Sequence, residues 1–190
     1  FLSRLSRIAS GKPVLPDAVE TGKVKKELEG LPIEVAKIDK TEKRRRPQAP
    51  YTTSKLQQES YTRIGFSSAN TMRIAQRLYE GVELGSEGSV GLITYMRTDS
   101  VNVAVSAQKE AAQFITEKFG ADYLPKEPPV YKSRKSAQEA HEAIRPTSAY
   151  RTPDSLKEFL AEDELKLYEL IWRKFIASQM VPAVDEVTSI

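Results

Sequence analysis

The spacing of apolar and polar positions predicts a chain of short helices. Most of the expected helices begin at or next to a residue that caps helix N-termini, the last begins with three acids, and most end at a glycine or before a proline. The expected helices cover residues 17–29, 54–64, 69–79, 102 (or 100) to 119, 152–160 and 162–181. The pair at 54–64 and 69–79 is joined by a tight turn at Gly65 and resembles a helix-turn-helix.

Extended segments are expected between and beside these helices. Alternating positions predict strands over residues 32–39 and 184–190, and Phe1–Ile8 alternates without a clean apolar side. Residues 82–90 are expected to be a loop because they hold Gly85 and Gly88. Together the pattern predicts an α+β fold that is mainly helical.

The segment Gly91–Ser100 opens apolar, as a short buried strand does, and turns polar at Thr94. In an extended chain, side chains two residues apart share a face, so Tyr95, Arg97 and Asp99 are expected to point the same way. A tyrosine can be a nucleophile when a nearby cation favours its phenolate, and an arginine can hold a phosphate with two hydrogen bonds. The alternative is a purely structural role, in which Tyr95 ends a core strand and Arg97 pairs with Asp99 at the surface.

Basic side chains gather at two further places. Lys43, Arg44, Arg45 and Arg46 form a run closed by two prolines, which is typical of a stiff, extended connector. The helix pair carries Arg63, Arg73 and Arg77 with no acid between Glu59 and Glu80. Both groups are candidates for contact with DNA phosphates, and both are also compatible with solvated charges on ordinary elements. Another basic cluster, in addition to these two groups, lies at residues 132–135.

The composition of the chain excludes some kinds of site and partner. The chain has 190 residues and a net charge of +3, while residues 1–50 alone carry 12 basic and 7 acidic side chains. No apolar run reaches the ~20 residues of a membrane span, so no membrane partner is expected. Cysteine is absent, which excludes disulfides, and with His141 as the only histidine a zinc site is not expected. The first residue is not methionine, and we interpret the chain as an internal fragment of a cytoplasmic protein.

Four stretches, in order, resemble the type IA DNA topoisomerases of bacteria. They are Pro50–Glu59, Thr71–Gly81, Gly91–Ser100 and Ser136–Pro146. The resemblance implies that Tyr95 attacks a phosphate of single-stranded DNA and becomes linked to its 5′ end, that Arg97 holds this phosphate, and that the strand passage so permitted relaxes negatively supercoiled duplex DNA. It also places His141, Asp99 and Arg145 near the site, with less defined roles.

The resemblance further implies an architecture and a cofactor. Residues 49–148 would form a helical, tyrosine-bearing domain, and residues 1–48 and 149–190 would be parts of a β-rich arch domain that carries it. The family binds Mg²⁺ on a separate domain through an Asp-x-Asp-x-Glu cluster, a spacing that does not occur here. The fragment alone is therefore expected to bind DNA without cutting it. The complete enzyme would need the remaining domains of the same polypeptide and would act at the nucleoid. Two alternatives stay open: a DNA-binding module without catalysis, and the topoisomerase part of a reverse gyrase.

Overall fold

The computed structural model describes residues 5–7, 11–32, 34–131 and 141–190. The chain divides into two compact units, one of Phe1–Thr41 with Glu186–Ile190 and one of Glu42–Asp185. The alternation expected at Phe1–Ile8 falls largely outside the described residues, and so does the basic cluster at 132–135.

The first unit contains α1 (Ala18–Leu28), which confirms the expected helix. Asp17 caps it, because its side chain accepts a hydrogen bond from the backbone N–H of Glu20 at 2.8 Å. None of the residues of α1 is buried. The helix therefore depends on its capping and on its own side-chain pairs, such as Lys23 with Glu20 at 2.6 Å, more than on tertiary packing.

Strand β1 (Asp39–Arg45) pairs with β4 (Ala183–Ser189) in a two-stranded sheet. The strand expected at 184–190 is thus confirmed, but the one expected at 32–39 is wrong, since the described residues before Asp39 form no strand. Every residue of β1 is exposed. Alternation could not locate this strand because neither of its faces is buried, and its position follows from the partner strand. The basic run therefore lies mostly within β1, not on a connector.

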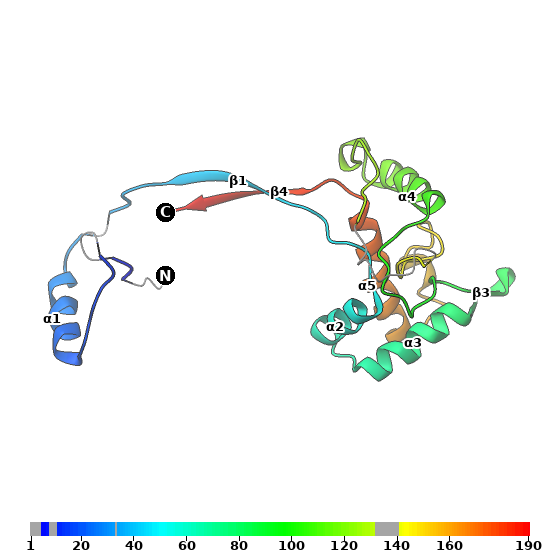
Figure 1. Ribbon diagram of the computed structural model, residues 1–190, viewed down its shortest axis with the longest axis horizontal. Coiled ribbons are helices and arrows are strands. Elements are labelled where there is room, and N and C mark those ends of the chain that lie inside the picture. The colour runs from blue at the N-terminus through cyan, green and yellow to red at the C-terminus, as the bar shows by residue number, and fades with distance from the viewer. Residues whose placement is uncertain (1–4, 8–10, 33, 132–140) are drawn as a thin grey trace. The chain divides into compact units, whose positions relative to one another are not determined.

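The second unit is built on four helices: α2 (Thr53–Ile64), α3 (Ser68–Glu80), α4 (Val105–Lys118) and α5 (Glu162–Ser178). Helices α2, α3 and α5 pack against one another (Figure 1). Thr52 and Ser67 cap α2 and α3 through their side chains, and Gly65 ends α2 with a φ of 75°, a backbone conformation that glycine adopts without strain. The expected helix pair is therefore confirmed, with Thr52 as the cap of its first helix.

Other elements differ from expectation. The expected loop at 82–90 contains a hairpin of β2 (Val82–Glu83) and β3 (Ser89–Val90), in which Val82 pairs with Val90, around a 3-10 turn at Gly85–Glu87. The helix expected at 152–160 is reduced to a 3-10 turn at Asp154–Leu156, because so short a segment gains few hydrogen bonds for the residues it fixes. A further 3-10 turn lies at Ala121–Tyr123.

The main core joins segments that are far apart in the sequence. Leu56, Ile74 and Leu78 of the helix pair lie in the same buried cluster as Leu167 and Ile171 of α5. The structure therefore groups residues 149–185 with the helical unit, whereas the sequence analysis divided the chain at residue 148. The reason is packing: the apolar face of α5 is covered by α3 and α2.

Candidate functional site

The segment Gly91–Ser100 forms no strand among the described residues, which corrects the expected β-element. Ile93 makes a single bridge with Pro146, and Leu92 and Ile93 are buried. From residue 95 on, exposed and buried residues nevertheless alternate as they do in a strand. Tyr95, Arg97 and Asp99 are all exposed, while Met96, Thr98 and Ser100 between and after them are buried.

Thr53, the first residue of α2, holds this segment from one side. Its backbone N–H donates to the carbonyl of Thr98 at 2.9 Å, and its hydroxyl donates to the carbonyl of Met96 at 2.7 Å. The same hydroxyl accepts a hydrogen bond from the N–H of Thr98 at 2.8 Å. These bonds satisfy polar backbone groups on both sides of Arg97, and they replace the ladder that a neighbouring strand would supply.

Thr94 holds the segment from the other side. Its N–H donates to the carbonyl of Arg145 at 2.9 Å, and its hydroxyl donates to the carbonyl of Ala143 at 2.7 Å. In return, the N–H of Arg145 donates to the Thr94 hydroxyl at 3.0 Å. Tyr95 therefore stands between two backbone anchors, contributed by α2 and by residues 143–145.

Tyr95 lines a hollow of about 300 Å³. Its phenol is 45% exposed, and its ring meets the ring of Tyr79 edge to face at a centroid distance of 5.3 Å. The hollow is lined by Tyr79, Thr94, Tyr95, Thr98, His141 and Glu142. The structure thus brings His141 and Tyr95, which are 46 positions apart, to one concave surface that is open to a ligand.

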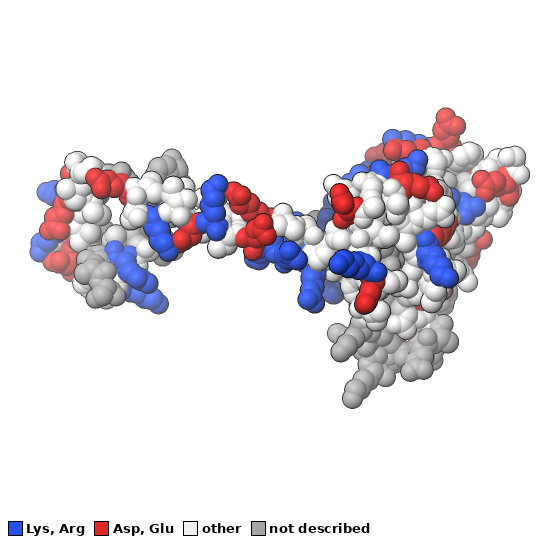
Figure 2. All heavy atoms as spheres, turned by 90° about the horizontal axis from the view of Figure 1, so that it is seen from above, with Lys and Arg blue, Asp and Glu red and all other residues white. Residues whose placement is uncertain are grey.

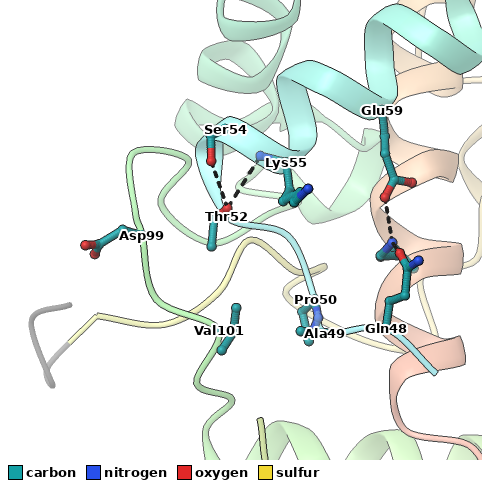
Figure 3. Close-up of a pocket in the computed structure, with 10 residues that line it drawn as sticks. Gln48, Ala49, Pro50, Thr52, Ser54, Lys55, Glu59, Asp99 and Val101 are labelled. Atoms are coloured by element: carbon teal, nitrogen blue, oxygen red, sulfur yellow. Dashed lines mark hydrogen bonds and ion pairs between the residues drawn. The ribbon is translucent and has the colours of Figure 1, made fainter. Parts of the chain in front are cut away.

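Arg97 and Asp99 do not form the surface ion pair that a purely structural role predicted. In the part of the chain that the structure describes, neither side chain has an ion-pair partner. Asp99 lines a different hollow, of about 530 Å³, together with Thr52, Ser54 and Lys55 at the start of α2 (Figure 3). The structure therefore separates Asp99 from the hollow that Tyr95 shares with His141.

Arg145 is almost fully buried and is engaged within the protein. Its Nε donates to Glu142 Oε2 at 2.7 Å, and its Nη1 donates to the carbonyl of Pro146 at 3.0 Å. Glu142 Oε2 also accepts a hydrogen bond from the N–H of Ala104, which precedes α4, at 3.2 Å. In this arrangement Arg145 supports the wall of the hollow through Glu142.

The sequence analysis missed a partly buried polar cluster of Tyr51, Glu59 and Lys174. Tyr51 is 1% exposed, and its hydroxyl donates to Glu59 Oε2 at 2.7 Å. Lys174 of α5 donates to Glu59 Oε1 at 2.7 Å and lies 5.1 Å from the centre of the Tyr51 ring. The carbonyl of Tyr51 accepts from the N–H of Ile144, so the cluster ties α2, α5 and the segment after His141 together. The available signal was the run Pro50–Glu59, which places Tyr51 eight residues before a carboxylate.

The raised pKa of Tyr51 makes this residue unsuited to act as a nucleophile. Burial, together with the neighbouring Glu59 carboxylate, raises the pKa of Tyr51 well above its usual value, so its phenol stays protonated. Burial also acts to raise the pKa of Glu59, but hydrogen bonds from Lys174 and Tyr51 outweigh it and leave that pKa lowered. The cluster is thus an ionised Glu59–Lys174 pair braced by a neutral tyrosine.

The arginines proposed for DNA contact on the helix pair have partners within the protein. Arg73 donates to Asn70 at 2.7 Å, Arg77 pairs with Glu164 at 2.8 Å, and Arg63 pairs with Glu59 at 3.2 Å. On the face of the helical unit drawn in Figure 2, basic and acidic side chains are interspersed. The described part of the chain holds no group of three acidic or histidine side chains that could bind a metal ion.

Within the described residues, no helix combines the length and the apolar character that crossing a membrane requires.

Comparisons with known proteins agree on one family. A family model described as DNA topoisomerase matches residues 8–190. The chain is 50% identical over 159 residues to DNA topoisomerase 1 of Xylella fastidiosa, strains Temecula1 and 9a5c, which covers 83% of this chain and 20% of each relative. Full-length topoisomerase I from Thermotoga maritima superposes with a TM-score of 0.77 at 42% identity, over 95% of this chain and 28% of that one. The chain thus spans about a fifth of the length of the curated relatives it matches.

Proposed function

The chain belongs to the bacterial DNA topoisomerase family, and from this membership we propose that it carries the nucleophile of a type IA topoisomerase. The Tyr95 hydroxyl attacks a phosphate of single-stranded DNA, forms a phosphotyrosine at the 5′ end and releases the 3′ hydroxyl. The released hydroxyl then attacks the phosphotyrosine, which restores the strand. Because the ester formed resembles the one broken, the step needs no nucleotide fuel. The observation that carries the proposal is an exposed Tyr95 phenol in a hollow shared with His141.

Two further side chains have roles in this proposal. Arg97 is exposed two residues after Tyr95, and no described residue pairs with it, so its guanidinium is free to hold the attacked phosphate. His141 presents an imidazole to the same hollow, where it can accept or donate a proton as the phenol reacts. Asp99 and Arg145 have no direct role here, because one lines a different hollow and the other is bound to Glu142.

The family resemblance also implies Mg²⁺, which would supply positive charge to the DNA phosphates when bound. The described residues do not fit this ion, and we derive no step through it. We propose that it is held by other domains of a longer polypeptide. In that setting the protein would act in the cytoplasm, at the nucleoid, on negatively supercoiled duplex DNA. The present chain by itself is expected to bind single-stranded DNA without cutting it.

The first prediction tests the nucleophile. In the full natural chain that contains this sequence, Tyr95→Phe should abolish the covalent DNA adduct, because the attacking oxygen is lost while the ring remains. The measurement uses 5′-labelled and 3′-labelled single-stranded DNA with Mg²⁺, quenched in detergent and resolved on a denaturing gel. The Tyr61→Phe variant is the matched control, since Tyr61 is exposed on α2 and does not line the hollow.

An adduct that persists in Tyr95→Phe would refute the assignment. Absence of any adduct in the unsubstituted protein, with DNA binding intact, would favour a DNA-binding module without catalysis.

A further inference from the structure

A second hollow, of about 610 Å³, lies in the helical unit and shares no lining residue with the hollow of Tyr95. Four cationic side chains line it: Arg45, Arg46, Arg63 and Lys174. No acidic side chain is among its described lining residues. Three segments far apart in the sequence supply these cations, so no single stretch of the chain reveals the site.

Ion pairs within the protein engage three of these four cations. Glu59 pairs with Arg63 at 3.2 Å and with Lys174 at 2.7 Å, so one carboxylate orients two cations. Arg45 lies 3.7 Å from Asp185. Arg46 is exposed and has no ion-pair or hydrogen-bond partner among the described residues. Four cations against these two carboxylates leave a local charge of +2, which favours an anionic ligand.

Apart from Gln48, the remaining lining is mostly apolar and includes an accessible aromatic ring. Tyr123 is 51% exposed, and the thioether of Met180 lies on the same hollow. The carbonyl of Tyr123 accepts a hydrogen bond from the N–H of Val181 at 3.0 Å, which fixes the tyrosine backbone beside the end of α5. A guanidinium for a phosphate next to an aromatic face for a base is the combination that binds single-stranded nucleic acid without reading its sequence.

We propose that this hollow binds single-stranded nucleic acid, with a phosphate at Arg46 and Arg63 and a base stacked on Tyr123. This inference takes from the proposed function only that the ligand is DNA. It adds a binding site apart from the tyrosine that would form the covalent bond. A strand held here is anchored on the helical unit whether or not another segment of it lies in the hollow of Tyr95.

The second prediction uses this chain and two fluorescent probes, a 12-nucleotide oligothymidylate and an abasic oligonucleotide of the same length. Arg46→Gln should raise the Kd for both probes about three- to tenfold and reduce the salt dependence by about 0.7 in log–log slope, the share of one phosphate contact on a single strand. Tyr123→Leu should raise the Kd about fivefold for oligothymidylate only, since a stacked base is lost. The matched control is Lys118→Gln, which removes the same charge from an exposed lysine on α4 that does not line the hollow.

Two results would overturn the site. One is an Arg46→Gln effect no larger than that of Lys118→Gln, and the other is a Tyr123→Leu effect that is equal on both probes. Circular dichroism of each variant establishes that it is folded. The two proposals fail independently, because Tyr95→Phe tests adduct formation in the full natural chain, whereas Arg46→Gln and Tyr123→Leu test binding by this chain.

Discussion

At the scale of single residues, two threonines set the position of the candidate nucleophile. Thr53 binds Met96 and Thr98 after Tyr95, and Thr94, just before Tyr95, binds Ala143 and Arg145; each threonine uses both its backbone and its hydroxyl. The hydroxyl of Thr53 donates to one carbonyl and accepts from one N–H, a pair of roles that no aliphatic side chain can fill. The position of Tyr95 and Arg97 therefore depends on bonds to two distant parts of the chain, Thr53 and residues 143–145.

The third prediction concerns Thr53. Thr53→Val keeps the shape but leaves the Met96 carbonyl and the Thr98 N–H without this partner, which should destabilise the fold by about 1–3 kcal/mol. In the full natural chain it should also slow adduct formation about tenfold at saturating DNA, because Tyr95 and Arg97 lose their fixed separation. Thr53→Ser should restore most of the rate, and Thr62→Val, on an exposed face of the same helix, should have little effect. A Thr53→Val protein with a normal rate of adduct formation would show that Thr53 does not position the tyrosine.

At the scale of elements, each helix is positioned by the side chains that it buries, and these are not all of its apolar side chains. On α4, Val105 at the first position is 65% exposed, and Phe119, which follows the helix, is 45% exposed. The buried face is instead Ala107, Ala111, Phe114 and Ile115. The helix itself was correctly predicted. Its buried face includes the small residues Ala107 and Ala111, which lie in the same cluster as Phe114 and Ile115.

Helix α5 links the two buried clusters through Trp172. The indole is partly buried, packs against both clusters and meets the ring of Phe114 edge to face at 5.6 Å. Its N–H donates to the carbonyl of Ala149 at 3.0 Å. Helix α5 thus serves core packing, and its Leu167 and Ile171 are more deeply buried than Leu165 and Trp172.

The fourth prediction follows from this link. Trp172→Ala should destabilise the helical unit by about 3 kcal/mol, because it removes aromatic packing in both clusters and leaves the Ala149 carbonyl unpaired. Urea unfolding followed by circular dichroism measures the change. Arg173→Ala, at the adjacent exposed position, should change the stability by less than about 0.5 kcal/mol. Equal midpoints for Trp172→Ala and the unsubstituted chain would contradict a core role for the indole.

At the scale of the whole molecule, the two compact units differ in how they are stabilised. The unit of residues 42–185 holds both buried clusters. In the other unit, α1 has no buried residue, and Val14, Val19 and Leu31 are exposed. Burial of apolar surface is the main source of folding free energy, so local opening should be far easier in residues 11–38 than in the helical unit.

The fifth prediction uses this contrast. Limited trypsin digestion with mass spectrometry should find early cuts at Lys23, Lys25, Lys26 and Lys37, because these sites lie in chain with little buried surface. Cuts within α2, α3 and α5 should appear only later, since exposing those sites requires opening of the main core. Early cleavage at Arg63 or Arg77, before the sites in α1, would contradict the assignment of stability to the helical unit.

The sequence by itself determined the local features of the protein. Caps and glycines located α1, α2 and α3 to within a residue or two, because capping bonds and left-handed backbone positions depend on near neighbours. Alternation after Thr94 was enough to place Tyr95 and Arg97 on the exposed side. The four motif stretches pointed to the family that the comparisons then supported.

Only the tertiary structure decided which distant residues meet. It paired β1 with β4, placed His141 with Tyr95 but Asp99 elsewhere, and engaged Arg145 with Glu142. It also gathered cations from three segments around one hollow. These outcomes depend on contacts between residues tens of positions apart, whose formation is set by packing of the whole core and leaves no periodic trace in any one segment.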